Sequence, residues 1–291
     1  MENRNNKLQS IAGFENIGIH LIDKLAEGIG WCFTHDTPKR LADKSFIKGI
    51  EESDLSPIEK YALISNYKKI IKEYVNQQKI VENAFDHLVQ GSKPELVDDT
   101  WISLFMDKAK NISEEMYQDI WGKILAEECN NPGEISKSLL VTLEQMDKDD
   151  AEMFLELCSC SVEISNGNDS DYSPIITNFG RGSFWKTRIN LDLLLRLKTL
   201  GLIDYRLDDN QKSFSVSLDE LGVVNKGRLF AVYFDEKYEF PEDIIEIPVG
   251  QVIFSKTGTI LRKIVTPDKH NDYFKDICIP LWKNQIGISI K

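Results

Sequence analysis

The residues of this sequence that could most readily do chemistry are three pairs of adjacent carboxylates: Asp98-Asp99, Glu127-Glu128 and Asp149-Asp150. Paired carboxylates can bind a divalent metal or carry general acid–base catalysis. Each pair, however, falls where helical periodicity places the end of a helix, so caps and solvated faces are the favoured interpretation. Glu127 and Glu128 differ from the others because acids near a helix C-terminus oppose the helix dipole. We expect another group, such as a basic side chain from a flanking segment, to compensate them.

Metal-binding motifs are weak in this chain. Cys158 and Cys160 have the wrong spacing for a zinc knuckle and are interpreted as small buried hydrophobes. The four histidines lie far apart in the sequence and include no pair at i, i+4: His20, His35, His87 and His270. The sequence therefore predicts neither a metal site nor a cofactor.

Phosphate-binding and nucleophile motifs are equally weak. Residues 179–184 (FGRGSF) form a Gly-rich turn without the Walker or dinucleotide spacing, which indicates a turn or a wing tip. Residues 255–258 (SKTG) and 65–68 (SNYK) match, in wording alone, two short elements of penicillin-recognising enzymes. Residues 65–68 lie within a long helical pattern, which argues against a catalytic serine there. An enzyme is not expected, although an unrecognised carboxylate- or metal-dependent hydrolase or nuclease is kept as an alternative.

Charge is unevenly distributed along the 291 residues, whose formal net charge is −12. Residues 98–163 hold 16 acids and five lysines, whereas residues 38–80 carry a net charge of +3 and residues 181–200 a net charge of +4. Such a chain is a poor non-specific nucleic-acid binder, because phosphate binding depends on basic side chains. The basic flanks could instead dock on the acidic block, within one chain or between subunits.

The sequence also bears on where the protein is found. Its five cysteines are an odd number at irregular spacing, and residues 1–10 do not read as a secretory signal. No stretch of 18 or more apolar residues is present, so no transmembrane helix is expected. We predict a cytoplasmic protein with reduced cysteines.

Apolar periodicity predicts helices in the N-terminal part. Residues 11–33 have apolar side chains at helical spacing. Residues 56–59 (SPIE) form a capping box that starts a second helix, which Gly91 and Pro94 stop. At 1.5 Å per residue this helix would reach roughly 50 Å. It must therefore bend, or part of it must pack against a partner.

The acidic block from Asp98 to Glu163 predicts a compact helical bundle. Ser113, Ser136 and Asp147 are the expected N-caps of three of its helices. The turn at residues 130–133 (NNPG) ends the first of these helices sharply.

The pattern changes after residue 164. Residues 165–173 are expected to be a polar loop, and Asn190 caps a helix that Gly201 closes. Residues 202–207 and 213–218 are predicted to pair as a hairpin, with further strands at 229–234, 252–254 and 286–290 and helices from Thr257 and over 273–282. The predicted order of elements is that of a winged-helix module: a helix, a glycine, a strand, a hairpin and a further strand.

The predicted fold class is thus α+β, mainly α, with a helical N-terminal half and central bundle before a winged-helix-like domain. The predicted domains are residues 1–95, 96–164 and 165–291. The last contains the candidate contacts for nucleic acid or a partner, which are Arg181, Lys186, Arg188, Arg196 and Lys198.

One stretch has a family resemblance. Residues 121–133 (WGKILAEECNNPG), 135–143 and 149–154 (DDAEMF) resemble a bacterial family of unknown function, domain family 2806. That family's pattern is roughly Trp-x-x-Leu-Leu-x-Glu, Pro-Gly, a Ser-started helix and Asp-Ala-x-x-Phe. Residues 21–30, 38–44, 197–203 and 257–261 also look like parts of it. The resemblance implies no established activity and no site residue, but by analogy it suggests accessory proteins of phage defence.

Three hypotheses follow. The first is a non-enzymatic bacterial cytosolic protein that acts through protein partners or as a homo-oligomer, in phage defence. The second is a winged-helix nucleic-acid-binding regulator. The third is the hydrolase or nuclease described above.

Overall fold

The computed structural model describes residues 14–33, 44–165, 170–176, 189–205, 215–217, 230–233, 236–239, 246–248, 250–267 and 273–286. The chain divides into two compact units, residues 1–140 and 141–291. The predicted three-domain division draws its boundaries elsewhere, after residues 95 and 164, and stays a prediction.

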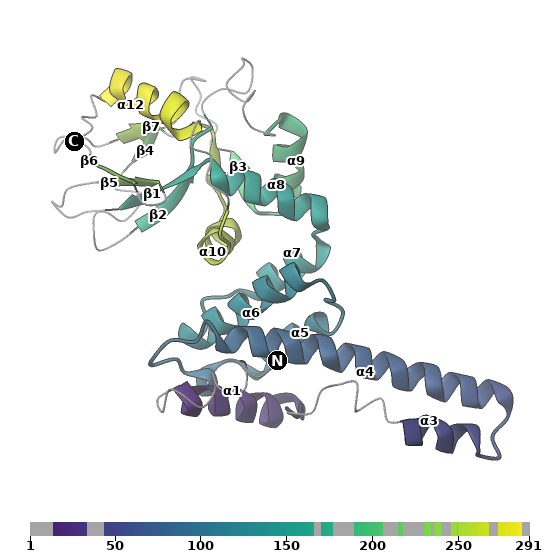
Figure 1. The fold of residues 1–291 in the computed structure, drawn as a ribbon. Helices are drawn as coiled ribbons and strands as arrows, with labels where there is room; N and C mark the ends of the chain where they lie inside the picture. The colour runs from purple at the N-terminus through teal and green to yellow at the C-terminus, as the bar shows by residue number, and fades with distance from the viewer. Residues whose placement is uncertain are drawn as a thin grey trace. The chain divides into compact units, whose positions relative to one another are not determined.

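The described part of the first unit is helical (Figure 1). Its elements are α1 (Phe14–Ile29), α3 (Lys44–Glu51), α4 (Pro57–Phe85), a 3-10 turn (Pro94–Leu96), α5 (Asp99–Ala109), α6 (Glu115–Asn130) and the start of α7 (Lys137–Gln145). The prediction of a helix within residues 11–33 is confirmed by α1.

The start of α4 confirms the predicted capping box. The backbone N–H of Ser56 donates to Glu59 Oε2 at 2.8 Å, and Pro57 occupies the first turn. The helix ends at Phe85, earlier than its apolar pattern suggested. Beyond it the Asn130 side chain accepts from Val89 N and donates to the His87 carbonyl, so the end of α6 holds this segment in a non-helical path.

Packing between α4 and α6 forms the centre of the first unit. The Phe105 ring lies between Trp101 and Trp121, with centroids 5.1 and 5.2 Å away, and all three side chains are buried. Gly122 brings α6 close to α4, since a Cβ there would lie 2.6 Å from Asn83 Cβ.

One predicted cap was wrong: Glu114, and not Ser113, occupies the N-cap of α6.

Gly122→Ala is expected to destabilise the first unit by about 2–3 kcal/mol, because overpacking forces the two helix backbones apart. Urea unfolding followed by tryptophan fluorescence measures this loss. Gly49→Ala in α3 is the matched control, because a Cβ there meets nothing within 4 Å. An equal response from the two variants would contradict the close approach at Gly122.

The second unit mixes helices and strands (Figure 1). Its helices are α8 (Lys148–Ser159), α9 (Leu191–Thr199), α10 (Lys256–Ile264), a π-helical turn (Phe274–Cys278) and α12 (Ile279–Ile286). Its strands are β1 (Ser161–Ser165), β2 (Ser170–Pro174), β3 (Ile203–Tyr205), β4 (Ser215–Ser217), β5 (Phe230–Tyr233), β6 (Glu236–Glu239), β7 (Glu246–Pro248) and β8 (Val252–Phe254). The fold class predicted from sequence, α+β and mainly α, is confirmed.

Most predicted helix starts in this part of the chain are confirmed. Asp147 accepts from Asp150 N at 2.9 Å, Asn190 accepts from Leu193 N at 2.9 Å, and Ser136 precedes α7. Helix α10 begins one residue before the predicted Thr257, with Ser255 as its cap. The strand predicted at residues 286–290 falls largely outside the described residues.

Two strand predictions were wrong. The expected polar loop at residues 165–173 contains most of β2, which pairs antiparallel with β1 in a sheet of order β2-β1-β5-β6. The polar side chains of β2 give no strand pattern in the sequence. The strand forms because it pairs with β1, which buries Val162 and Ile164.

The second wrong prediction is the hairpin between residues 202–207 and 213–218. Strand β3 pairs with β8, and β4 pairs with β7. The physical reason is burial: β8 brings Val252 and Phe254 into the core beside Ile203, whereas the sequence Ser-Val-Ser of β4 has one apolar residue. The hairpin on which the winged-helix likeness rested is therefore replaced by other pairings.

Candidate functional site

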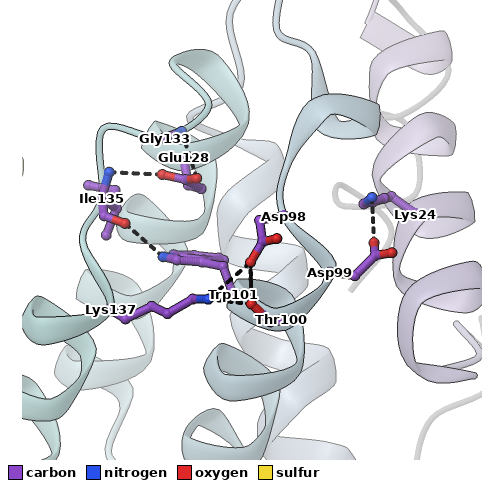
Figure 2. Close-up of polar contacts among 9 residues, drawn as sticks. All are labelled: Lys24, Asp98, Asp99, Thr100, Trp101, Glu128, Gly133, Ile135 and Lys137. Atoms are coloured by element: carbon purple, nitrogen blue, oxygen red, sulfur yellow. Dashed lines mark hydrogen bonds and ion pairs between the residues drawn. The ribbon is translucent and has the colours of Figure 1, made fainter.

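The first carboxylate pair lies at the start of α5 (Figure 2). Asp98 is the N-cap, accepting from Trp101 N at 2.9 Å and from the Thr100 hydroxyl, and Lys137 Nζ lies 3.1 Å from its Oδ1. These hydrogen bonds, that from Thr100 foremost, lower the pKa of Asp98 to about 2. Asp99 instead pairs with Lys24 of α1 at 2.6 Å. Asp98 therefore caps the helix, as the sequence predicted, whereas the ion pair by which Asp99 ties α5 to α1 was not predicted.

The second pair is compensated in a way the sequence did not reveal. The buried Glu128 carboxylate accepts the backbone N–H groups of Gly133 and Ile135, each at 2.8 Å (Figure 2). The Ile135 carbonyl in turn accepts from Trp101 Nε1 at 2.8 Å. Glu127 accepts from the Asn131 side chain at 2.9 Å. The expectation of a basic partner was thus wrong, because donors of the turn after α6 take that role.

The electrostatics of Glu128 follow from this burial. Desolvation raises the pKa of Glu128 above its usual range, although the two backbone donors favour its ionised form. Each carboxylate oxygen accepts one N–H of the turn, and the bond from Trp101 to the Ile135 carbonyl joins that turn to α5.

The third pair joins two helices of the second unit. Asp150 closes the capping box of α8, accepting from Asp147 N, and also receives Arg196 Nε and the Arg196 terminal nitrogen at 2.6 Å each. The Arg196 guanidinium lowers the pKa of Asp150, and the carboxylate is 3% exposed. This bidentate pair ties α8 to α9.

Asp150→Ala is expected to cost the second unit about 2 kcal/mol, because it removes charge-assisted hydrogen bonds at a buried acceptor. Arg196 is partly exposed, so solvent screening limits its share. Thermal unfolding of Asp150→Ala, Arg196→Ala and the double variant measures the coupling between them. If the stability losses of the two single variants add up to that of the double variant, the pairing is contradicted. Lys198→Ala is the control, because it removes an exposed ion pair and should cost less stability.

The cysteines and acids do not gather into a metal centre in the part of the chain that the structure describes. Cys129, Cys158, Cys160 and Cys278 are buried and Cys32 is exposed, all as free thiols. Burial raises the pKa of Cys160 to about 12, which opposes a thiolate role. The interpretation of Cys158 and Cys160 as buried small hydrophobes is confirmed.

The five basic candidates are divided by the structure. Arg181, Lys186 and Arg188 lie outside the described residues. Arg196 and Lys198 lie in the last turn of α9, where Arg196 pairs with Asp150 and Lys198 pairs with Asp204 at 2.8 Å.

The same helix exposes apolar side chains that the sequence analysis did not single out. Leu191 is 56% and Leu195 48% exposed, and the two residues lie one turn apart on α9. An exposed leucine pair suits a protein contact better than a contact with phosphates. The periodicity of the leucines after Asn190 predicted the helix, but only the fold shows which of these leucines stay outside the core.

A larger apolar surface lies on the α3–α4 arm, which we define as residues 44–72. The five buried residues of α4 all lie between Asn76 and Ala84, so its first half takes no part in the core (Figure 1). Helix α3 pairs with that half through the Phe46 and Tyr67 rings, whose centroids are 4.4 Å apart, and Lys60 Nζ donates to the Glu51 carbonyl at 2.8 Å. The arm is therefore held together mainly by its own two helices.

Exposed apolar residues are concentrated on this arm. Ile58 and Tyr61 are each 77% exposed, and the set also includes Phe46, Leu55, Leu63 and Ile70. On α4, Ile58 and Tyr61 lie on one face, whereas Leu63 and Ile70 lie on another. Exposed apolar side chains gathered on one element favour an interaction site more than singly scattered ones do. The sequence signal was the length of α4, which exceeded what a small unit needs.

Comparison with known proteins agrees with the resemblance. The family model described as protein of unknown function DUF2806 matches residues 66–278. No curated protein and no solved structure matches the chain. Among the described residues, no helix is long and apolar enough to cross a membrane. The matched range spans α5, α6, the Glu128 turn and most of the second unit, and so the chain belongs to the DUF2806 family.

Proposed function

We propose that this protein is a non-enzymatic interaction protein that assembles through its α3–α4 arm. The observation that carries this proposal is the exposure of Ile58 and Tyr61 on a helix half that has no core to bury them. Burying such side chains in a contact removes apolar surface from water, which is the main driving force of association.

The second unit has the complementary role of binding or sensing a partner. Leu191 and Leu195 on α9 support a protein as that partner, and the ion pairs of Arg196 and Lys198 reduce the basic surface available to nucleic acid. The biological setting that we propose is phage defence in bacteria, where the protein would be an accessory or sensor component. Loss of protection against phage plating on deletion of the gene tests this setting.

Light scattering of the full chain at micromolar concentration tests the assembly role. We expect an oligomer for the wild type and a smaller mass for Ile58→Ser/Tyr61→Ser, which removes the most exposed apolar pair. Val89→Ser is the matched control, because Val89 is exposed at 52% outside the arm. A clean monomer for the wild type would overturn the assembly role.

A further inference from the structure

We propose that the partner of the α3–α4 arm is the same arm of a second copy of this chain, crossing it antiparallel about a two-fold axis near Tyr61. This inference rests on the proposed assembly role and names its geometry. Two observations carry it: the exposed apolar pair at residues 58 and 61, and the separation of charge along the arm.

Charge along residues 51–72 of the arm reverses sign at one point. Residues 51–59, here called the tip, contain four acids and no basic residue, whereas residues 60–72, here called the shaft, contain four lysines and no acid. Glu51, Glu52 and Asp54 of the tip are exposed, and so are Lys68, Lys69 and Lys72 of the shaft. Such a segment is complementary to an inverted copy of itself, which is what an isologous contact requires.

The side chains face suitable directions for this contact. Lys60 and Tyr67 are on the side of α4 that meets α3. Ile58, Tyr61, Lys68 and Lys72 follow one another at intervals of three, seven and four residues, so they share another face of the helix. An antiparallel copy placed on that face brings Ile58 and Tyr61 of both chains together at the axis. It also brings each acidic tip beside the other chain's lysines.

Other arrangements fit these charges less well. A parallel pair would set lysines against lysines and acids against acids, which is unfavourable. Docking of the shaft on the acidic block at residues 98–163 would satisfy the lysines but leave the acidic tip beside further acids. The antiparallel arm pair alone uses both halves of the arm.

Charge reversal tests the geometry in the full chain. The tip variant is Glu52→Lys/Asp54→Lys, the shaft variant is Lys68→Glu/Lys72→Glu, and the third variant combines all four changes. Each of the first two gives the exchanged positions the same sign as the positions they face on the other chain, so that like charges meet and we expect its dimer dissociation constant to rise at least tenfold. The combined variant should recover to within about threefold of the wild type. An equimolar mixture of the tip and shaft variants should form heterodimers.

Sedimentation equilibrium measures these constants, and circular dichroism verifies that each variant is folded. Lys79→Glu, an exposed change on α4 outside the arm, is the control and should leave the constant unchanged. If the shaft variant weakens the dimer and the combined variant does not restore it, the arm docks elsewhere; the arm pair is then refuted while the assembly role stands. A dimer that no variant affects also refutes the arm pair, and a monomeric wild type refutes both proposals.

Discussion

Gly258→Ala is expected to destabilise the second unit by about 3 kcal/mol or more, or to prevent it from folding. A Cβ at this position in α10 would lie 1.9 Å from the Leu202 carbonyl oxygen, which is backbone and has little freedom to move. The same carbonyl accepts from Ser255 N at 3.0 Å, and the Ser255 hydroxyl donates to the Gly201 carbonyl at 2.5 Å. Relief of the overlap would therefore break the hydrogen bonds that seat α10.

Urea unfolding of Gly258→Ala, with Gly49→Ala as the open helical control, measures this effect. The control should be neutral or slightly stabilising, because alanine has a higher helix propensity than glycine. A Gly258→Ala variant as stable as the wild type would show that α10 does not lie against Leu202.

Glu128→Ala has the second large effect and is expected to cost the first unit about 3 kcal/mol. It leaves two backbone N–H groups without their acceptor, that of the buried Ile135 and that of Gly133, whose hydrogen bond is partly buried. The adjacent Glu127→Ala is the control, because that carboxylate accepts from the Asn131 side chain at an exposed site. Equal losses in the two variants would contradict the special role of Glu128.

The pH dependence of Glu128 has a definite sign. Its pKa is raised on folding, so between the unfolded and folded pKa values the native state binds more protons than the unfolded chain. The contribution of Glu128 to stability is thus fully present below the unfolded pKa and declines as the pH rises through the folded pKa. The difference in stability between the wild type and Glu128→Ala should become smaller as the pH rises through that window, whereas the part that comes from the two N–H groups left without an acceptor should remain.

Local signals in the sequence predicted much of this fold. Capping residues such as Ser56, Asp147 and Asn190 act within one helical turn, so their roles can be read without knowledge of the rest of the chain. Strand pairing between β3 and β8 joins residues some fifty positions apart, and no local pattern specifies it.

The candidate site was less predictable for the same reason. Glu128 could be recognised as an anomaly, but its partners are backbone groups of a turn whose path depends on packing against Trp101. Arg196 could be seen as basic, but not as the partner of Asp150. The exposure of Ile58 and Tyr61 follows from where the core ends along α4, which the periodicity of the helix does not specify.

Site-specific cross-linking tests the arm contact most directly. Cys32 is the exposed cysteine, so Cys32→Ser provides a background in which an introduced thiol can be probed. A short bismaleimide should link Tyr61→Cys to its copy and convert most of the chain to covalent dimer, because the two-fold axis brings these positions together. Lys79→Cys, on α4 outside the arm, should remain monomeric. Failure of Tyr61→Cys to cross-link above the level of Lys79→Cys, at concentrations where the protein is dimeric, would contradict the account.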